Sequence, residues 1–327
     1  MFLEFRSGYY LKWIGVSLVI TATSCMSEAG KKSASASKQN TERSSKQVVE
    51  VKTTAAKQKA TAKAKTGTEG MVYFPGGEIK IGTSKARSYE KPVFTTKVKP
   101  FWLDKNLVTV KEFREFVNET GYKTDADKFG NSLVFDFNTG KWEFVDGANW
   151  EFPFGRGKEA AKDNHPVTQV SYHDAKAYAE WADKRLPTEI EWEYAARNGK
   201  NTDQNYPWGN DLVVNGKYMA NVWQGPLQPQ PEVKDGFLYT SPVGYFGETP
   251  AGLTDMSGNV WQWTDSYFMP YPGSEFEGRA GPDENSRVLR GGSFMYDEYG
   301  PLSNSVWFRS MNTIETSLFN MGFRCAK

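Results

Sequence analysis

The side chains best suited to metal binding or nucleophilic attack are few in this chain of 327 residues. It contains two histidines, His165 and His173, and two cysteines, Cys25 and Cys325. Two histidines exclude a three-histidine zinc site, and they exclude an iron site of two histidines and one carboxylate unless both converge. Two cysteines cannot build a disulfide-rich scaffold. Composition alone therefore excludes several common kinds of metal and disulfide chemistry.

Ser293 is a candidate nucleophile, but nucleophilic catalysis requires a base beside the hydroxyl. Neither histidine belongs to a motif that would supply that base. His165 precedes Pro166 and is expected to satisfy a turn, and His173 falls in the first turn of a predicted helix. The pattern therefore gives little support to a serine-based mechanism.

Two local clusters of functional side chains have simpler structural explanations. Glu189, Glu191 and Glu193 follow one another at i, i+2 and i+4, a spacing that we expect to scatter the carboxylates around a helix. An aromatic run could line a ligand or glycan surface, but its spacing favours a place in the core: Trp261, Trp263, Tyr267 and Phe268. Neither cluster predicts a catalytic site.

The N-terminal region is typical of an export signal. Arg6 and Lys12 precede a short apolar stretch, residues 13–22, and Cys25 follows small residues directly after it. The stretch is shorter than the roughly 20 residues that span a bilayer, but it suits a signal-peptide core. The cysteine in this position resembles the bacterial lipobox, which predicts a signal peptide over residues 1–24 and lipidation of Cys25. The alternatives are an ordinary signal peptide with an incidental cysteine, or a short uncleaved anchor.

Residues 25–70 are predicted to be the lipidated cysteine followed by a flexible basic tether. Residues 26–70 hold 10 basic and 4 acidic side chains and no aromatic ones, so they cannot bury enough apolar surface to fold. Subtracting this +6 and the +1 of the first 25 residues from the total of +1 leaves −6 for residues 71–327. Nucleic-acid-binding surfaces are basic, so no nucleic-acid partner is expected.

Three helices are predicted in residues 71–327, which form the globular domain. A capping box at Thr109 begins the first, which ends at Gly121, and Ser171 begins the second. Thr188 begins the third, which ends near Asn198. Short runs at 72–74, 78–81 and 288–289 favour strands, and long stretches rich in Gly, Pro and Asn lie between them. The pattern predicts an α+β fold with little regular secondary structure.

Nine collinear segments of this domain resemble the formylglycine-generating enzyme (sulfatase-modifying factor) family. The resemblance covers nearly all of residues 71–327 and implies a variant of the C-type lectin fold. The segments are Met71-Val-Tyr-Phe-Pro-Gly-Gly77, Asp146-Gly-Ala-Asn-Trp150, His165-Pro-Val-Thr-Gln-Val-Ser171, Arg185-Leu-Pro-Thr-Glu-Ile-Glu-Trp-Glu-Tyr-Ala-Ala-Arg197, Tyr206-Pro-Trp-Gly209, Asn221-Val-Trp-Gln-Gly225, Asp255-Met-Ser-Gly-Asn-Val-Trp-Gln-Trp263, Arg290-Gly-Gly-Ser-Phe294 and Gly322-Phe-Arg-Cys-Ala326.

The resemblance also implies that the family's oxidase chemistry is absent. Enzymes of the family oxidise a sulfatase cysteine with two thiolates that bind Cu(I), an ion that prefers soft sulfur ligands. Alignment from the Gly-Gly-Ser motif places Tyr296 and Pro301 at those two positions, so copper is not expected. The family often pairs the cysteine equivalent to Cys325 with one in the second helix. Ala179 takes that second position here, so Cys325 is expected to be a free, buried thiol.

Calcium is the cofactor that the resemblance retains. The first family site uses an Asn side chain, the next carbonyl, an Asp and a carbonyl two residues later, here Asn221, Val222, Asp235 and Phe237. A second, weaker site corresponds to Asp255, Gly258, Val260 and Gln262, where glutamine replaces the family's Glu. Oxygen ligands of this kind suit Ca²⁺. The alternative is that these residues simply hold turns.

We therefore expect a non-catalytic, lipid-anchored envelope protein, a pseudoenzyme whose domain is a structural or protein-binding subunit of an outer-membrane assembly. The resemblance extends to lipoproteins of gliding motility and protein-secretion machinery. The expected partners are the membrane, through the lipid, and other envelope proteins. Glu28 stands alone after Cys25, so no surface-export signal is evident and the periplasmic face of the outer membrane is expected.

Three further possibilities remain open from the sequence, of which the first and the third use the family cleft. One is an oxidoreductase-like enzyme with a copper-independent site around Ser293, Tyr296 and Asp297. Another is a glycan-binding module. The third is a protein-binding surface in the retained cleft that also includes Glu298 and Tyr299.

Overall fold

The computed structural model describes residues 67–86, 88–225, 232–278, 281–295 and 302–327. The predicted signal peptide, the lipidation site Cys25 and residues 26–66 of the tether lie outside these ranges. Among the described residues, no helix has the length and apolar character needed to cross a bilayer.

Capping boxes begin all four α-helices of the described residues. The three predicted helices are confirmed, and α1 ends at Gly121, which adopts a left-handed conformation with φ of 67°. A fourth helix, α2, was not predicted because it has only five residues, although Thr124 and Asp127 form its capping box. The bounds are α1 (Val110–Thr120), α2 (Asp125–Phe129), α3 (Tyr172–Trp181) and α4 (Glu189–Ala196).

The strands are short, and most form isolated antiparallel pairs. The pairs are β1 (Met71–Phe74) with β4 (Phe101–Asp104), β2 (Gly77–Ile81) with β3 (Phe94–Val98), β5 (Asn131–Asp136) with β6 (Lys141–Asp146), and β7 (Val213–Val214) with β8 (Lys217–Tyr218). One four-stranded sheet has the order β11 (Ser310–Thr313), β10 (Ser286–Arg290), β9 (Trp261–Trp263) and β12 (Met321–Gly322). A single 3₁₀ turn covers Ser88–Glu90. The predicted α+β class with little regular structure is confirmed.

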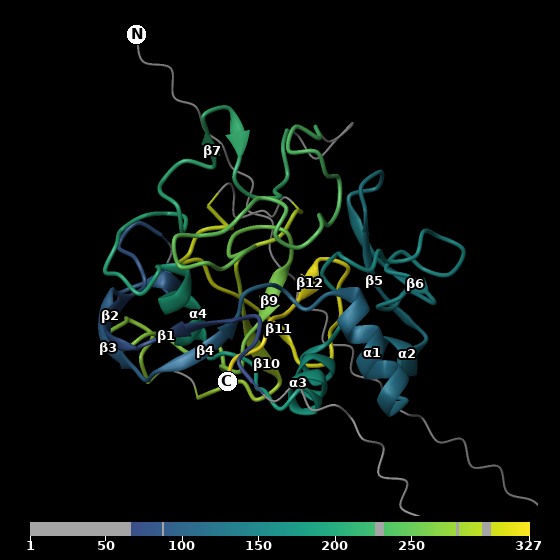
Figure 1. Ribbon diagram of the computed structural model, residues 1–327, viewed down its shortest axis with the longest axis horizontal. Coiled ribbons are helices and arrows are strands. Elements are labelled where there is room, and N and C mark those ends of the chain that lie inside the picture. Colours follow the sequence, from purple (N-terminus) through teal and green to yellow (C-terminus); the bar gives the residue numbers. More distant parts are fainter. Residues whose placement is uncertain (1–66, 87, 226–231, 279–280, 296–301) are drawn as a thin grey trace, which may run out of the picture. The chain divides into compact units, whose positions relative to one another are not determined.

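The four-stranded sheet lies at the centre of the globular domain. In Figure 1, β1 to β4 and α4 lie on one side of this sheet, and α1, α2, β5 and β6 lie on the other. Strand β12 is parallel to β9 and brings the end of the chain beside it, with Gly322 opposite Gln262. Because β10 is antiparallel to β9, the residues that follow β10 come together with those that precede β9 and β12, although they are far apart in sequence.

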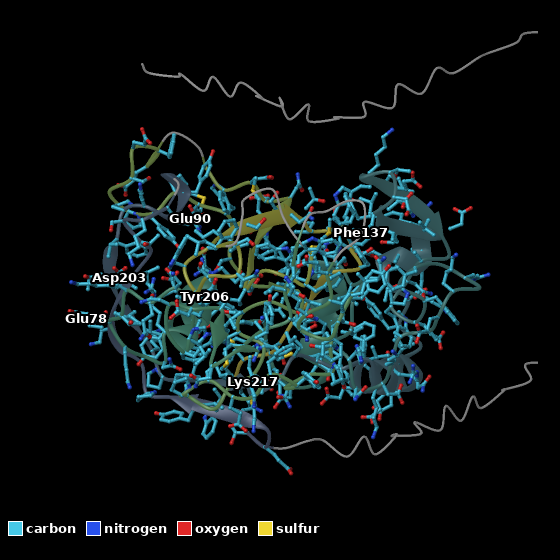
Figure 2. All side chains as sticks on the ribbon, turned by 90° about the horizontal axis from the view of Figure 1, so that it is seen from above. Glu78, Glu90, Phe137, Asp203, Tyr206 and Lys217 are labelled. Carbon is cyan, nitrogen blue, oxygen red and sulfur yellow. The ribbon has the colours of Figure 1, made fainter. Side chains whose placement is uncertain are left out.

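Aromatic side chains form much of the core, and Figure 2 shows side chains filling the space between the elements. Trp192 and Trp263 are completely buried, and Trp261 is 7% exposed. The core prediction for the aromatic run therefore holds for its two tryptophans. Tyr267, by contrast, is 39% exposed, and the guanidinium of Arg287 lies 3.9 Å from its ring centroid. This tyrosine is a surface residue.

Candidate functional site

Ser293 lies just beyond β10, at the end of a double-glycine turn. Gly291 and Gly292 adopt φ values of 90° and 72°, which favour glycine. A Cβ at Gly291 would lie 2.9 Å from the Nε2 atom of Gln262, and one at Gly292 would lie 1.8 Å from the Oδ1 atom of Asn304. Both glycines are therefore required for the close packing that places Ser293.

The hydroxyl of Ser293 is buried and is bound by neutral donors. Its Oγ accepts hydrogen bonds from the Nδ2 atom of Asn320 at 3.1 Å and from the backbone N–H of Met295 at 3.3 Å. Among the described residues, neither a histidine nor a carboxylate is hydrogen-bonded to this hydroxyl. The arrangement provides no base for nucleophilic attack.

Both histidines have structural partners elsewhere. The Nδ1 atom of His165 lies 2.9 Å from the Oγ1 atom of Thr240, and burial, helped by Lys162, lowers the pKa of His165 to about 4. The Nδ1 atom of His173 lies 3.0 Å from the Oδ2 atom of Asp125. Both contacts join distant segments, because Thr240 lies 75 positions from His165 and Asp125 lies 48 positions from His173.

Within the described ranges, three buried polar atoms on residues 304–320 have no hydrogen-bond partner. These are the Oδ1 atoms of Asn304 and Asn320 and the Nε1 atom of Trp307. Their side chains are at most 7% exposed. An unsatisfied buried polar group costs about 1–3 kcal/mol, so these atoms would gain from a partner. The other residues predicted to line the cleft lie outside the described residues: Tyr296, Asp297, Glu298 and Tyr299, together with Pro301.

The structure brings the residues of the first predicted calcium set together, although the Val222 carbonyl already accepts a hydrogen bond from the Nε2 atom of Gln224. The Oδ1 atom of Asn221 is buried and has no hydrogen-bond partner among the described residues. The Asp235 carboxylate accepts hydrogen bonds from the backbone N–H groups of Val222 at 2.9 Å and Phe237 at 3.0 Å. Burial raises the pKa of Asp235, and these amide donors offset the rise only in part. An unpartnered amide oxygen beside a buried carboxylate fits the hard oxygen ligands that Ca²⁺ takes.

The second predicted set is arranged differently, because its glutamine is already satisfied. The Nε2 atom of Gln262 donates to the carbonyl of Asp255 at 2.8 Å. Its Oε1 atom accepts from the Nε1 atom of Trp192 and from the Nε atom of Arg324, both at 2.8 Å. Two members of this set, Gln262 and Asp255, thus use their oxygens within the protein. Gly258 and Val260 complete the predicted set.

The prediction that Glu189 and Glu193 scatter around their helix is wrong, because residues four apart share a helix face. Glu193 is completely buried between Arg197 and Arg290. Glu189 binds Arg290 at 3.2 Å and the Nε atom of Arg309 at 2.6 Å. Only Glu191 points elsewhere, to Arg185 at 2.7 Å. The i, i+4 spacing was the signal that could have identified this buried ionic network.

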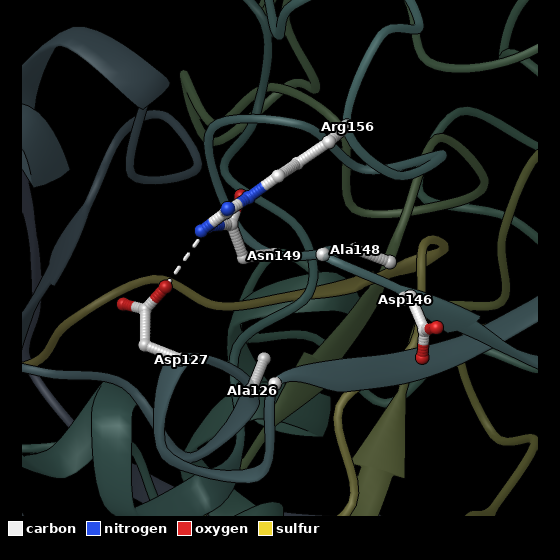
Figure 3. Close-up of a pocket in the computed structure, with 8 residues that line it drawn as sticks. Ala126, Asp127, Asp146, Ala148, Asn149 and Arg156 are labelled. Atoms are coloured by element: carbon white, nitrogen blue, oxygen red, sulfur yellow. Dashed lines mark hydrogen bonds between the residues drawn. The ribbon is translucent and has the colours of Figure 1, made fainter.

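A separate pocket of about 330 Å³ lies between α2, the end of β6 and the loop that follows it. Figure 3 shows the Arg156 side chain reaching over it and the Asp127 side chain on its other side. Asp127 is held in place by Asn149, whose Nδ2 atom donates to it at 2.9 Å. No sequence motif indicated this pocket. The remaining lining residues are Ala126, Gly130, Asp146, Gly147 and Ala148.

Cys325 is a free and completely buried thiol, as the sequence predicts. Burial, with a smaller contribution from Asp104, raises the pKa of this thiol well above its usual value. Among the described residues, no three His, Cys, Asp or Glu side chains are grouped closely enough to hold a metal ion. A metal site among these residues would therefore need amide or carbonyl oxygens in addition to any carboxylate.

Comparison with known proteins identifies relatives over the whole globular domain. A protein-family model described as "Sulfatase-modifying factor enzyme 1-like domain" matches residues 56–327. The formylglycine-generating enzyme of Streptomyces coelicolor is 40% identical over 281 residues, which cover 79% of this chain and 89% of the relative. The inactive Cα-formylglycine-generating enzyme 2 of Mus musculus is 41% identical over 276 residues, covering 78% and 85%.

The fold also agrees with solved structures. PvdO from Pseudomonas aeruginosa superposes with a TM-score of 0.59 at 25% identity, covering 78% of this chain and 93% of PvdO. The formylglycine-generating-enzyme-like variant of the C-type lectin fold is therefore confirmed. The relatives include proteins named as enzymes and proteins named as inactive, so their names alone do not assign a reaction to this chain.

Proposed function

Because this chain belongs to the sulfatase-modifying factor enzyme 1-like family, we propose that it is a member without oxidase activity that serves as a binding subunit of the cell envelope. The observation that carries the proposal is the replacement of both copper-binding cysteines, by Tyr296 and Pro301. Neither a phenol nor a proline ring supplies the soft donor that Cu(I) needs. Inactive relatives at about 40% identity, from Bos taurus and Mus musculus, support the same reading.

The contacts of Ser293 argue against catalysis by this residue and are compatible with a binding role for its surroundings. Its hydroxyl is held by Asn320 and Met295, so the rival serine-centred enzyme lacks a base in the described part of the domain. Asn320, which contacts this hydroxyl, and Asn304, which packs against Gly292, each have a side-chain oxygen without a partner among the described residues. Such atoms gain free energy when a partner satisfies them. We therefore place the binding surface at this position.

The anchoring part of the proposal comes from the N-terminal sequence. Lipidation at Cys25 would hold the protein on a membrane face, because more than one acyl chain gives stable anchoring. A flexible tether of about 45 residues would place the domain about 35–40 Å from that membrane. We propose the periplasmic face of the outer membrane, with envelope proteins as partners, in an assembly of the gliding or secretion type.

A pull-down from detergent-solubilised envelopes tests this function. The full chain, tagged at its C-terminus and cross-linked in cells, is expected to co-purify with a defined envelope protein. Cys25→Ser should reduce that recovery strongly, because the domain is no longer concentrated at the membrane. Recovery of the wild-type chain alone, with an equal yield of tagged protein, would contradict the proposed role.

We also propose that one calcium ion binds the first ligand set. Asn221 would provide its side-chain oxygen, Asp235 its carboxylate, and Val222 and Phe237 their carbonyls. Calcium would supply positive charge to a buried carboxylate whose partners are neutral amides. It would also tie residues 221–222 to residues 235–237, which lie in a segment without regular secondary structure. The ion would thus have a structural role.

Removal of calcium is expected to lower the melting temperature by roughly 5–10 °C when the ion is present at about one hundred times its Kd. The stabilisation arises because the ion binds only the folded chain. Calorimetry with and without a chelator measures it. Asp235→Asn should abolish most of the shift, whereas Asp211→Asn, which changes an exposed carboxylate, should preserve it. A melting temperature indifferent to the chelator would contradict calcium binding.

A further inference from the structure

We propose that this chain has given up the family's second calcium ion, because Gln262 stands where the family has Glu, and its amide, held by Arg324 of the family-like segment Gly322–Ala326, donates to an oxygen that the ion would bind. Together the Gln262 amide and the Arg324 guanidinium donate hydrogen bonds to oxygen atoms that a calcium ion would otherwise bind. The inference builds on the proposed ion at the first ligand set, which serves as the internal reference for counting calcium. Its test compares the number of calcium ions bound by the wild type and by Gln262→Glu. The test can therefore fail even if the first calcium site is real.

Gln262 holds the central position in this replacement. Its side chain is completely buried, and all of its contacts fix the direction of the amide. The Nε2 atom lies 2.8 Å from the Asp255 carbonyl oxygen, as a donor must. The Oε1 atom receives N–H groups from Trp192 and Arg324. Reversal of the amide would place an NH₂ group against two donors, so this orientation is the one that the surroundings permit.

Arg324 supplies the positive charge. Its five N–H groups match five oxygen acceptors, of which one is Gln262 Oε1 and four are backbone carbonyls. A guanidinium has five such donors, so it is fully satisfied without a carboxylate. Burial lowers the pKa of Arg324 to about 10, and it stays charged at neutral pH. The four carbonyls belong to Asp104, Lys105, Thr254 and Asp255.

The Asp255 carboxylate partly balances this charge, but both its oxygens already accept hydrogen bonds. Its Oδ2 atom accepts from the backbone N–H of Gly244 at 2.7 Å, and its Oδ1 atom accepts from the Nδ2 atom of Asn259 at 3.2 Å. The Asp255 carbonyl accepts from both Gln262, at 2.8 Å, and Arg324, at 3.2 Å, which uses its two lone pairs. A calcium ion there would find the Asp255 carbonyl already occupied by two donors.

Replacement of the amide group of Gln262 by a carboxylate should restore calcium binding at this position. Gln262→Glu replaces the donating NH₂ with a carboxylate oxygen, which would then face the Asp255 carbonyl at about the 2.8 Å now spanned by a hydrogen bond. Two acceptors at that distance repel each other unless a cation lies between them. The Trp192 and Arg324 donors can still bind the other carboxylate oxygen. The variant should therefore acquire a calcium ion that the natural chain does not take.

Calcium titration calorimetry on the full chain, stripped with a chelator, tests the proposal. The wild type is expected to bind at most one ion, and Gln262→Glu one ion more than the wild type. The control is Gln169→Glu. Gln169 is as buried as Gln262, and its Nε2 atom likewise donates to backbone carbonyls, in this case those of Leu133 and Pro153. This control should gain no ion.

Thermal melting provides a second readout that separates folding from binding. Gln262→Glu should melt below the wild type in chelator and recover at least half of the loss in millimolar calcium, while Gln169→Glu should show no such recovery. Two ions on the wild type, or no additional ion on a folded Gln262→Glu variant, would overturn the proposal. Zero ions on the wild type and one on Gln262→Glu would refute the first calcium site but uphold this inference.

Discussion

Glu193→Ala is expected to reduce the free energy of unfolding by about 3–5 kcal/mol, the usual cost of removing one partner from a buried ion pair. The carboxylate is completely buried on α4. It accepts from the Gly82 backbone N–H at 2.8 Å and from Arg197 Nη2 at 2.7 Å, and it also binds Arg290. Without it, Arg197 loses its carboxylate and Arg290 retains only Glu189.

The electrostatics of the network explain why the loss should be so large. Three guanidiniums, Arg197, Arg290 and Arg309, face two carboxylates, so each carboxylate compensates more than one cation. Burial alone would raise the pKa of Glu193, but Arg290 and Arg197 outweigh it and hold the pKa below its usual 4.5. This stabilisation is therefore present above pH 4.5 and lost as the pH falls through the lowered folded-state pKa.

Chemical denaturation at pH 7 measures the effect. Glu159→Ala is the matched control, because its partner Lys162 is 61% exposed and Glu159 is 76% exposed, and such surface pairs contribute about 0–1 kcal/mol. Glu193→Gln keeps the shape of the side chain and removes its charge, so it provides a milder variant if the alanine variant does not fold. An equal loss of unfolding free energy in Glu193→Ala and Glu159→Ala would contradict the claim that the buried ionic network around Glu193 stabilises the fold.

The second large effect is a gain of copper binding. The double variant Tyr296→Cys, Pro301→Cys restores two thiols at the positions that the family resemblance assigns to the copper ligands. Because thiolates are the donors that Cu(I) prefers, we expect the double variant to bind Cu(I) at least 1000-fold more tightly than the wild type, which corresponds to about 4 kcal/mol. Competition with a chromogenic Cu(I) chelator measures the difference.

Each single variant serves as a control for the double one. Tyr296→Cys and Pro301→Cys alone provide one sulfur ligand, and each should fall well short of the pair. Cys325 is buried and its thiol pKa is raised, so it should not contribute a thiolate in any of these proteins. Tight Cu(I) binding by the wild type would contradict the assignment.

Local signals in the sequence predicted the parts of the fold that depend on neighbouring residues. Thr109, Ser171 and Thr188 each begin a helix because the capping box is contained within four residues. The five-residue helix α2 has the same signal at Thr124 but is too short to show a hydrophobic period. Helix starts were therefore predictable, whereas a single helical turn was not.

The candidate site was predictable only in part, because its contacts join distant segments. The resemblance indicated Ser293 and Gln262, but their partners Asn320 and Arg324 lie 27 and 62 positions away. The direction of the Gln262 amide depends on Trp192, Arg324 and Asp255 together, and no local pattern encodes it. The i, i+4 spacing places Glu189 and Glu193 on one helix face, but it does not identify the partner Arg290, which lies 97 positions beyond Glu193.

Turnover of a cysteine-containing sulfatase peptide tests the central claim most directly. The wild type and the double variant Tyr296→Cys, Pro301→Cys are incubated with the peptide, copper, oxygen and a thiol reductant, and aldehyde formation is followed by mass spectrometry. The formylglycine-generating enzyme of Streptomyces coelicolor provides the positive control. We predict that the wild type forms no aldehyde above the rate without protein. Copper-dependent aldehyde formation by the wild type would contradict the account of a binding subunit without oxidase chemistry.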